Sequence, residues 1–332
     1  MIIYFSDTWR LFPHFEYVKT LLQKVKDCFV NSPARKNRYL NHLRLNGIAS
    51  PRKIPLPVKT RWNTWFEMVF YSNEHIQYWR DFFNNELSLD SQNETLKSIT
   101  SFLNSQIKYG LIRIYISFIT IFAKQFVQDL DFFQTQNKPI FPFVENRLVN
   151  LTAYIQNNRT ADFFGSELED LITSFNFNPN EFYPIFQNAF EVAYKKFSIH
   201  IPQHPGRELF KACQIFNPYL FLISNTLRKD IRHYSIVTEL QNPSNELIIE
   251  WGIYCGLECH TTLQETDLNE YWLGLVQQLP LLSKIALDYI WLPISSCSVE
   301  RSFSMYNSLL NSDRQNLSLD SLKKLNMLYY NS

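Results

Sequence analysis

The sequence predicts a mostly α-helical protein, and three observations favour this fold class. Glycine is scarce, because the 332 residues contain 7 where average usage would give roughly 23, and an all-β chain needs glycine in its tight turns. Apolar residues recur at helical spacing in long stretches that Asn, Pro and Ser clusters separate. Hydrophobic residues make up 45% and aromatic residues 16% of the chain, so there is enough apolar surface for a large core and global disorder is excluded.

The first 61 residues predict two helices followed by an extended link. The first helix is expected over residues 15–30 and the second over residues 34–45, with the stop in Asn31-Ser32-Pro33 between them. Three prolines follow, and proline restricts both itself and the residue before it. Residues 54–58 are therefore expected to be extended.

A single long helix is predicted over residues 62–87, with Thr60 as its N-cap. Residues 88–93 break it, and a series of helices is expected from there to about residue 240. These helices vary in length without a fixed period, which excludes a repeat solenoid. The pattern predicts an all-α middle domain.

The last 63 residues predict four more helices. Pro280 suits the first position of a helix, where its missing N–H costs nothing, and residues 292–294 form an extended link. The expected helices cover residues 270–278, 280–290, 295–310 and 319–329.

Nothing in the sequence predicts secretion or a membrane span. Residues 1–13 carry Asp7 and Arg10 and do not resemble a signal peptide. The most apolar stretch, residues 111–126, is interrupted by Arg113 and Lys124, so a buried helix is expected there. Five cysteines, an odd number, fit free thiols in a reducing compartment. We expect a nuclear or cytoplasmic protein with no membrane partner.

The formal net charge of +1 hides an asymmetry along the chain. Residues 1–61 hold 12 lysines and arginines against three acidic residues, a net charge of +9, while residues 62–332 hold 20 against 28, a net charge of −8. A folded basic block of this kind is a candidate phosphate-binding surface. The alternative is a solvated helix face with no ligand.

The sequence offers no local signature of a small-molecule or metal site. No two glycines have the spacing of a nucleotide-binding loop, so most nucleotide-binding proteins of the Rossmann and P-loop classes are excluded. Cys255, Cys259 and His260 match no standard zinc pattern and are expected to include two free thiols. We therefore expect no small-molecule substrate and no metal or other cofactor in this chain.

The segment Leu292–Ser304, with the sequence LPISSCSVERSFS, resembles the C-terminal signature of hAT-superfamily transposases. An Arg-x-x-Leu element follows at Arg314–Leu317, as in that family. Upstream, Val58–Thr64 is similar to the family's T-R-W-N-[ST] element, and Ile215–Pro218 is similar to a weaker motif near the end of its helical insertion. The order and separation of these motifs agree with the family across essentially the whole chain.

The resemblance implies three parts: residues 1–61 as a basic remnant of an RNase H-like α/β core, residues 62–265 as a large helical insertion domain, and residues 266–332 as the hAT C-terminal dimerisation region. In this family two aspartates and one glutamate hold two divalent ions that cut and join DNA. The glutamate corresponds to Glu300. A plain helix residue favoured by the helix dipole is the alternative for this position.

The resemblance also implies DNA contacts. Trp62 would stack on a base, with Arg61 beside it, and base stacking on an aromatic ring contributes about 1–3 kcal/mol. Arg301 beside Glu300 would contact phosphate, and the basic block adds Lys53 and Lys59. For Trp62 the alternative is a core aromatic in a Trp-rich helix.

One departure from the family is serious. Both catalytic aspartates should precede Arg61, the second followed by a C-x-x-H element, but only Asp7 and Asp27 occur there and neither has that context. The N-terminal zinc finger usual in the family has no counterpart here either. We therefore expect a truncated or domesticated hAT-like protein whose Glu300 is vestigial, with Mg²⁺ relevant only if a missing N-terminal half is restored.

The predicted function is protein dimerisation with non-specific DNA binding, without self-sufficient catalysis. The last two helices carry more apolar surface than one terminal helix pair needs, so a second copy is expected to cover it, in a homodimer or a larger homo-oligomer. One alternative is a fragment of an active two-metal transposase, and a second is a helical scaffold that does not use DNA. The residues predicted for dimerisation are Val299, Phe303, Leu310, Leu322, Leu325 and Leu328.

Overall fold

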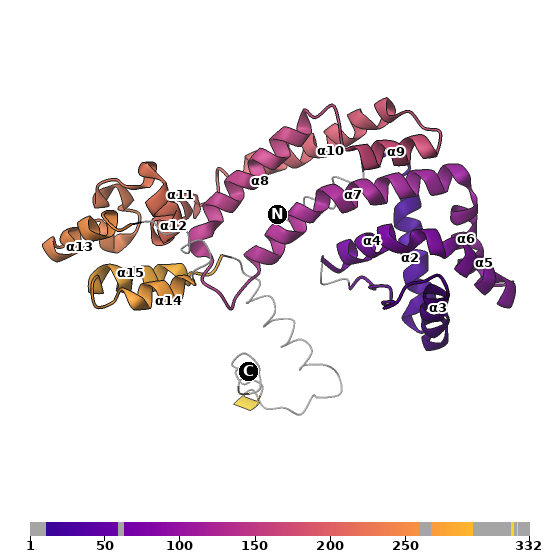
Figure 1. The fold of residues 1–332 in the computed structure, drawn as a ribbon, viewed down its shortest axis with the longest axis horizontal. Coiled ribbons are helices and arrows are strands. Elements are labelled where there is room, and N and C mark those ends of the chain that lie inside the picture. The colour runs from indigo at the N-terminus through magenta and orange to yellow at the C-terminus, as the bar shows by residue number, and fades with distance from the viewer. Residues whose placement is uncertain (1–10, 59–62, 259–266, 295–319, 322–323, 325–332) are drawn as a thin grey trace. The chain divides into compact units, whose positions relative to one another are not determined.

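The computed structural model of the chain describes residues 11–58, 63–258, 267–294, 320, 321 and 324 (Figure 1). Over these residues the protein is mostly helical and contains no β-strand, which confirms the mostly α prediction. The chain divides into two compact units. Unit 1 comprises residues 1–130 and 148–204, and unit 2 comprises residues 131–147 and 205–332.

Unit 1 is built from helices, and α7 is the longest of those that the structure describes. Helix α6 packs on both α2 and α5. The elements that lie wholly or largely in unit 1 are α2 (Glu16–Val30), α3 (Pro33–Leu45), α4 (Asn63–His75), η1 (Ile76–Tyr78), α5 (Trp79–Leu89), α6 (Glu94–Asn104), α7 (Gln106–Phe133), α8 (Val144–Arg159), α9 (Ser166–Ser174) and α10 (Pro179–His200).

The two N-terminal helices form where the sequence predicts them. Helix α2 buries one apolar stripe, whose members recur at helical spacing, and Pro33 occupies the first turn of α3. Residues 51–57 are not helical, as their prolines require. The buried stripe of α2 is Val18, Leu21, Leu22, Val25, Cys28 and Phe29.

The prediction of one continuous helix over residues 62–87 is wrong. Helix α4 ends at His75, where φ is −124°, a single 3₁₀ turn follows, and α5 begins at Trp79. The turn places the backbone carbonyl of Tyr78 3.0 Å from Nε2 of His42 on α3. The apolar periodicity continues through the break, because Ile76, like Trp79, is buried, and a pattern of burial alone does not reveal such a turn.

Helix α7 is the core helix of unit 1. Its residues Ile112, Ile114 and Ile116 are fully buried, and the ring of Phe118 stacks on Phe186 of α10 with centroids 4.0 Å apart. Apolar side chains on several faces of one helix indicate a helix surrounded by protein.

Helix α7 is also long and apolar enough to cross a membrane, judged by length and composition alone, and 61% of its most apolar 18-residue window is buried inside the protein. Core helices of soluble proteins pass the same test. The expected buried helix over residues 111–126 lies within it, and the Arg113 side chain there lies 3.3 Å from the Tyr109 hydroxyl.

Unit 2 consists of short helices and 3₁₀ turns. Its α14·α15 and α13·α15 pairs pack together, and Pro280 occupies the first turn of α15, as predicted. Its elements are η2 (Phe141–Phe143), α11 (Arg207–Ala212), η3 (Cys213–Phe216), α12 (Pro218–Ile223), η4 (Asn225–Leu227), η5 (Ile231–Tyr234), η6 (Thr238–Leu240), α13 (Asn245–Cys255), α14 (Leu268–Gly274) and α15 (Pro280–Ile290).

The segment Ile215–Pro218 is the centre of unit 2. The Tyr254 hydroxyl donates to the Ile215 carbonyl at 2.8 Å, and the Trp272 indole N–H donates to the Phe216 carbonyl at 2.9 Å. The buried Asn217 side chain accepts the Leu220 N–H and caps α12. Side chains from α13 and α14 thus satisfy the Ile215 and Phe216 carbonyls, while the Asn217 side chain satisfies an N–H in the first turn of α12.

Candidate nucleic-acid interface and dimerisation region

Lys53 is the one residue of the predicted DNA-contacting set that the described ranges include, and it is exposed. The other predicted DNA contacts, Lys59, Arg61, Trp62 and Arg301, lie outside the described residues, as does Glu300. The six residues predicted for dimerisation, Val299, Phe303, Leu310, Leu322, Leu325 and Leu328, lie outside them too. The N-terminal basic block can nevertheless be followed over residues 11–58.

Two arginines of the basic block bind an acidic residue of the next segment. Glu86 on α5 is only 3% exposed and accepts from Arg35 Nε at 2.8 Å. Arg38 approaches the same carboxylate with two nitrogens, Nε at 2.6 Å and Nη2 at 2.7 Å, which is the bidentate geometry of a strong charge-assisted pair. These arginines therefore hold α3 against α5, which competes with their use for phosphate.

The hydrogen bonds to Glu86 favour the ionised form of its carboxyl group in the folded protein. Burial raises the pKa of Glu86, but hydrogen bonds from Arg38 and Arg35 more than offset it, so the net pKa of this carboxyl is lowered. Arg35 also donates through Nη1 to the Cys28 carbonyl at the end of α2. One buried carboxylate thus organises α2, α3 and α5.

The extended segment of residues 51–58 is held at both ends. The Tyr71 hydroxyl donates to the Arg52 carbonyl at 2.8 Å, and Lys26 Nζ donates to the Pro57 carbonyl at 2.6 Å. Arg52 itself forms an exposed ion pair with Glu74 at 3.1 Å. The segment that carries Lys53 is therefore fixed in position although residues 51–57 have no regular secondary structure.

A buried hydroxyl network supports this arrangement. The Tyr39 hydroxyl accepts from the indole N–H of Trp79 at 3.0 Å and lies 3.3 Å from the Tyr71 hydroxyl. Burial raises the pKa of Tyr39 well above its usual range and that of Tyr71 to about 12. Both phenols stay protonated at neutral pH, so their role is hydrogen bonding and not acid–base chemistry.

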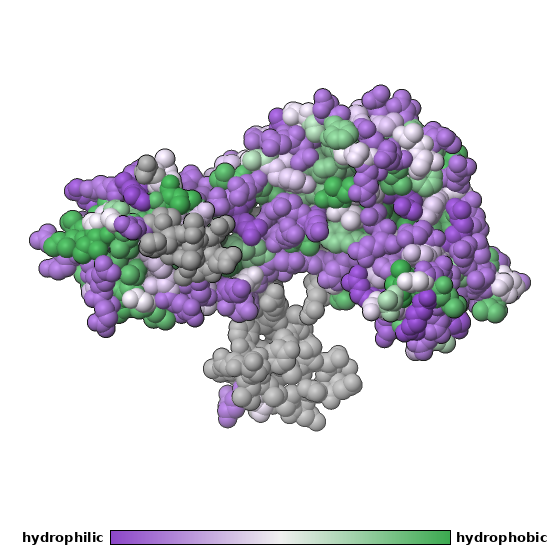
Figure 2. Space-filling view, in the orientation of Figure 1, coloured by the Kyte–Doolittle hydropathy of each residue, from purple (hydrophilic) through white to green (hydrophobic). Residues whose placement is uncertain are grey.

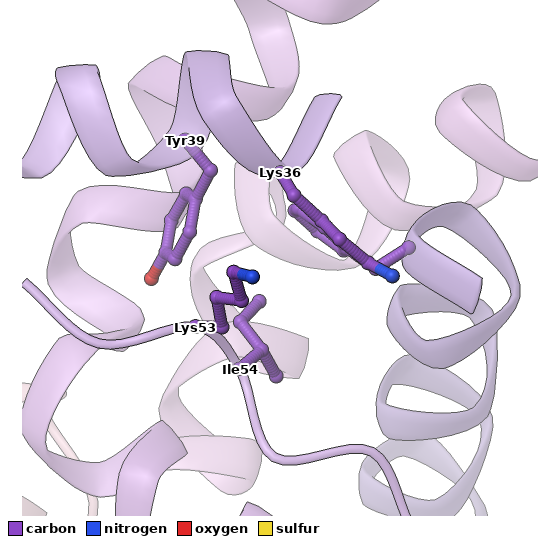
Figure 3. Close-up of a pocket in the computed structure, with 5 residues that line it drawn as sticks. Lys36, Tyr39, Lys53 and Ile54 are labelled. Atoms are coloured by element: carbon purple, nitrogen blue, oxygen red, sulfur yellow. The ribbon is translucent and has the colours of Figure 1, made fainter. Parts of the chain in front are cut away.

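Lys36 and Lys53 flank a small pocket on this part of unit 1 (Figure 3). Phe29, Tyr39 and Ile54 complete its lining. Its volume is about 10 Å³, close to the least that holds one water molecule. The pocket is therefore too small for a substrate, and two of the five side chains that line it are lysines.

Apart from Lys26, which donates to the Pro57 carbonyl, four basic side chains of residues 11–58 have no carboxylate within ion-pair distance among the described residues. Lys36 donates to the Val30 carbonyl and Arg44 to the Asn41 side chain, and both bonds are exposed and leave the positive charges uncompensated. The four are Lys24, Lys36, Arg44 and Lys53. They are the part of the basic block that remains available to an anionic partner.

Val58 and Thr64, which lie on either side of residues 59–62, are joined by a hydrogen bond. The backbone N–H of Val58 donates to Oγ1 of Thr64 at 2.9 Å.

Sequence reasoning did not identify Glu86 as a partner of the basic block. Its partners lie 48 and 51 positions away in the chain, so no local spacing signals the contact. The one available signal was its place within an otherwise apolar helical pattern beside Phe82 and Phe83, which are both buried. A charged residue on a buried face requires a partner.

The described residues contain no group of three or more His, Cys, Asp or Glu side chains that could hold a metal ion. Cys28, Cys213 and Cys255 are free thiols. Burial raises the pKa of Cys28 to about 11 and that of Cys213 to about 12, so neither is a reactive thiolate at neutral pH.

Comparison with known proteins assigns the C-terminal part of the chain. Residues 254–332 match the family model described as the hAT family C-terminal dimerisation region. A search of curated proteins finds no match. The match begins at Tyr254, the residue that binds the Ile215 carbonyl at the centre of unit 2, and it includes α14 and α15. The chain therefore carries an hAT C-terminal dimerisation region and is related to the hAT-family transposases.

Proposed function

We propose that this protein is a homodimer that binds DNA without sequence specificity. The observation that carries the proposal is the hAT dimerisation region at residues 254–332. Within this proposal the dimer brings two copies of the uncompensated basic residues of unit 1 to one DNA molecule. Two linked binding sites raise the overall affinity well above that of either site alone.

DNA binding is supported by the uncompensated lysines of residues 11–58. Lys36 and Lys53 flank one small pocket, and the fixed segment that carries Lys53 leads directly to Lys59, Arg61 and Trp62. In this proposal the lysines bind the phosphate backbone and the Trp62 ring stacks on a base.

Salt dependence tests this proposal. Fluorescence anisotropy of the full chain with a labelled 20-base-pair duplex, from 50 to 300 mM NaCl, should give an affinity that falls linearly with the logarithm of salt concentration. Each phosphate contact contributes a slope of about −0.9. A chain that does not bind the duplex, or binds it equally at all salt concentrations, would support the non-DNA scaffold instead.

Dimerisation is tested separately by light scattering of the full chain at micromolar concentration. A mass near twice the 39.6 kDa of one chain is the expected result. A strict monomer across this range would contradict the proposal even if DNA binding were observed.

We also propose that these 332 residues do not cleave DNA unaided. The family chemistry needs two aspartates together with Glu300, and Asp27, one of the two candidates upstream of Arg61, lies on α2, where it accepts from Gln23 at 2.7 Å. Incubating the chain with supercoiled plasmid in Mg²⁺ and in Mn²⁺ tests this, and metal-dependent nicking that Glu300→Gln abolishes would favour the active-transposase alternative.

The remaining parts of the proposal follow from these. Residues 1–61 as a remnant of an RNase H-like core, residues 62–265 as the insertion domain and residues 266–332 as the dimerisation region form the proposed division. A DNA partner favours a nuclear location, and the extensive burial of α7 favours a core helix over a membrane span. Imaging of the tagged chain in its own cells distinguishes a nuclear from a cytoplasmic or membrane location.

A further inference from the structure

Helix α13 has one buried face and one exposed face in unit 2, and the exposed face is apolar. Ile248, Ile249 and Ile253 are 46%, 64% and 40% exposed. The opposite face packs into unit 2 through Leu247, Glu250, Trp251 and Tyr254. The solvent side of a surface helix normally carries charged and polar residues. The exposed face of α13 is therefore unusual for a surface that contacts water alone.

No charge interrupts the exposed face. From residue 248 to residue 256 every exposed position of this segment is isoleucine or glycine, and the nearest exposed charge on the helix is Glu246 in its first turn. DNA does not fit such a surface, because it needs positive charge. A membrane surface fits poorly as well, since helices that lie on membranes flank their apolar face with lysine and arginine.

Gly252 lies in the middle of this face. A Cβ atom built there would meet nothing within 4 Å, so no neighbour among the described residues of the chain requires glycine. Glycine in a helix interior lowers the stability of the helix, and its usual compensation is the close approach of another backbone. The open space beside Gly252 leaves room for such an approach from outside the chain.

We propose that a second copy of this chain covers the exposed face of α13, with α13 of one protomer packed on α13 of its partner. The matched dimerisation region begins at Tyr254, within this helix, so the isoleucine face directly continues that region. Figure 2 shows hydrophobic residues gathered at the α13 end of unit 2. A two-fold pairing of the same face is the commonest way in which two identical chains associate, and this inference rests on the proposed dimerisation.

The experiment measures self-association of the full chain by sedimentation equilibrium, for the wild type and two substitutions. Ile249→Lys places a charge on the face and is expected to raise the dimer dissociation constant at least tenfold. Ile107→Lys is the matched control, because Ile107 on α7 is 66% exposed and lies in unit 1. The control should leave the dissociation constant within twofold of the wild type.

Gly252→Ala separates an interface effect from a folding defect. Alanine favours the helix and has open space here, so the melting temperature of the dilute monomer should rise while the dimer dissociation constant increases. A substitution that only damaged folding would lower the melting temperature.

The outcomes distinguish this inference from the proposed function. A wild type that stays monomeric overturns both. A wild-type dimer whose dissociation constant is unchanged by both α13 substitutions overturns the α13 interface alone and leaves dimerisation standing. The same holds if Ile249→Lys lowers only the melting temperature, because the face would then be covered within one chain.

Discussion

The Glu250 carboxylate accepts the backbone N–H of Leu282 at 2.8 Å, across 32 positions of the chain. It also accepts the N–H of Leu281 at 3.2 Å. Both N–H groups belong to the first turn of α15, where Leu279 provides no side-chain cap. A residue of α13 therefore supplies the cap that α15 lacks, and its negative charge suits the positive end of that helix.

Glu250→Ala should lower the free energy of unfolding by about 1–2 kcal/mol, because it removes the cap and leaves two N–H groups in the first turn of α15 without an acceptor. Thermal and urea unfolding measure the loss. The control is Glu258→Ala, since Glu258 is an exposed carboxylate in the same unit and should change stability by less than about 0.5 kcal/mol. Equal losses in the two variants would contradict the capping role.

Glu86→Gln should change how stability depends on pH. The pKa of Glu86 is lowered from its ordinary value of 4.5 in the folded protein, so its contribution is complete above that value and is lost as the pH falls through the folded pKa. At pH 7 the variant should be less stable by at most about 3 kcal/mol. This difference from the wild type should shrink as the pH falls below 4.5.

The control for this substitution is Glu94→Gln. Glu94 also pairs with a basic side chain, Lys97 at 2.8 Å, but it is 83% exposed, and exposed pairs contribute about 0–1 kcal/mol. Urea unfolding of wild type and both variants between pH 3 and pH 7 gives the comparison. A stability difference for Glu86→Gln that stays constant with pH would show that its ion pairs do not stabilise the fold.

Substituting both Lys36 and Lys53 by alanine should weaken DNA binding and reduce the magnitude of the salt slope by about 1.8, because each lost phosphate contact removes about 0.9. The matched control replaces Lys97 and Lys195, which pair with Glu94 and Glu191 and change the net charge by the same amount. Anisotropy titrations of both double variants measure the slopes. Identical slopes would mean that only net charge, and not this pocket, contributes to binding.

The local spacing of apolar residues, together with stop signals and prolines, predicted several helices correctly. Helices α2 and α3 were predicted to within one residue, because each has an apolar stripe or a stop signal in its own sequence, and the start of α15 followed from Pro280. The interruption between α4 and α5 was not predictable in this way. The Tyr78 carbonyl at this interruption lies 3.0 Å from Nε2 of His42, 36 positions away, and local spacing does not reveal such a partner.

The candidate site shows the same division between local and non-local information. The sequence located the excess positive charge in residues 1–61 and singled out Lys53 within it. It could not show that Arg35 and Arg38 bind the buried Glu86, because charge counts do not reveal which charges pair in the fold. The basic surface available to DNA is therefore smaller than the net charge of +9 suggests.

Two glycines within helices should respond in opposite ways to alanine. At Gly110 on α7, a Cβ atom would lie 2.9 Å from Cγ of Phe175 and 3.0 Å from Phe177. Gly110→Ala should therefore lower the free energy of unfolding, since overpacking costs about 1–3 kcal/mol.

At Gly252 no atom lies within 4 Å of the corresponding Cβ position, so Gly252→Ala should stabilise the dilute monomer by up to about 1 kcal/mol. Urea unfolding at nanomolar concentration, detected by tryptophan fluorescence, measures both changes. A stabilising Gly110→Ala would show that Phe175 and Phe177 move aside at no cost, and a destabilising Gly252→Ala would show that the space beside α13 is filled within the monomer.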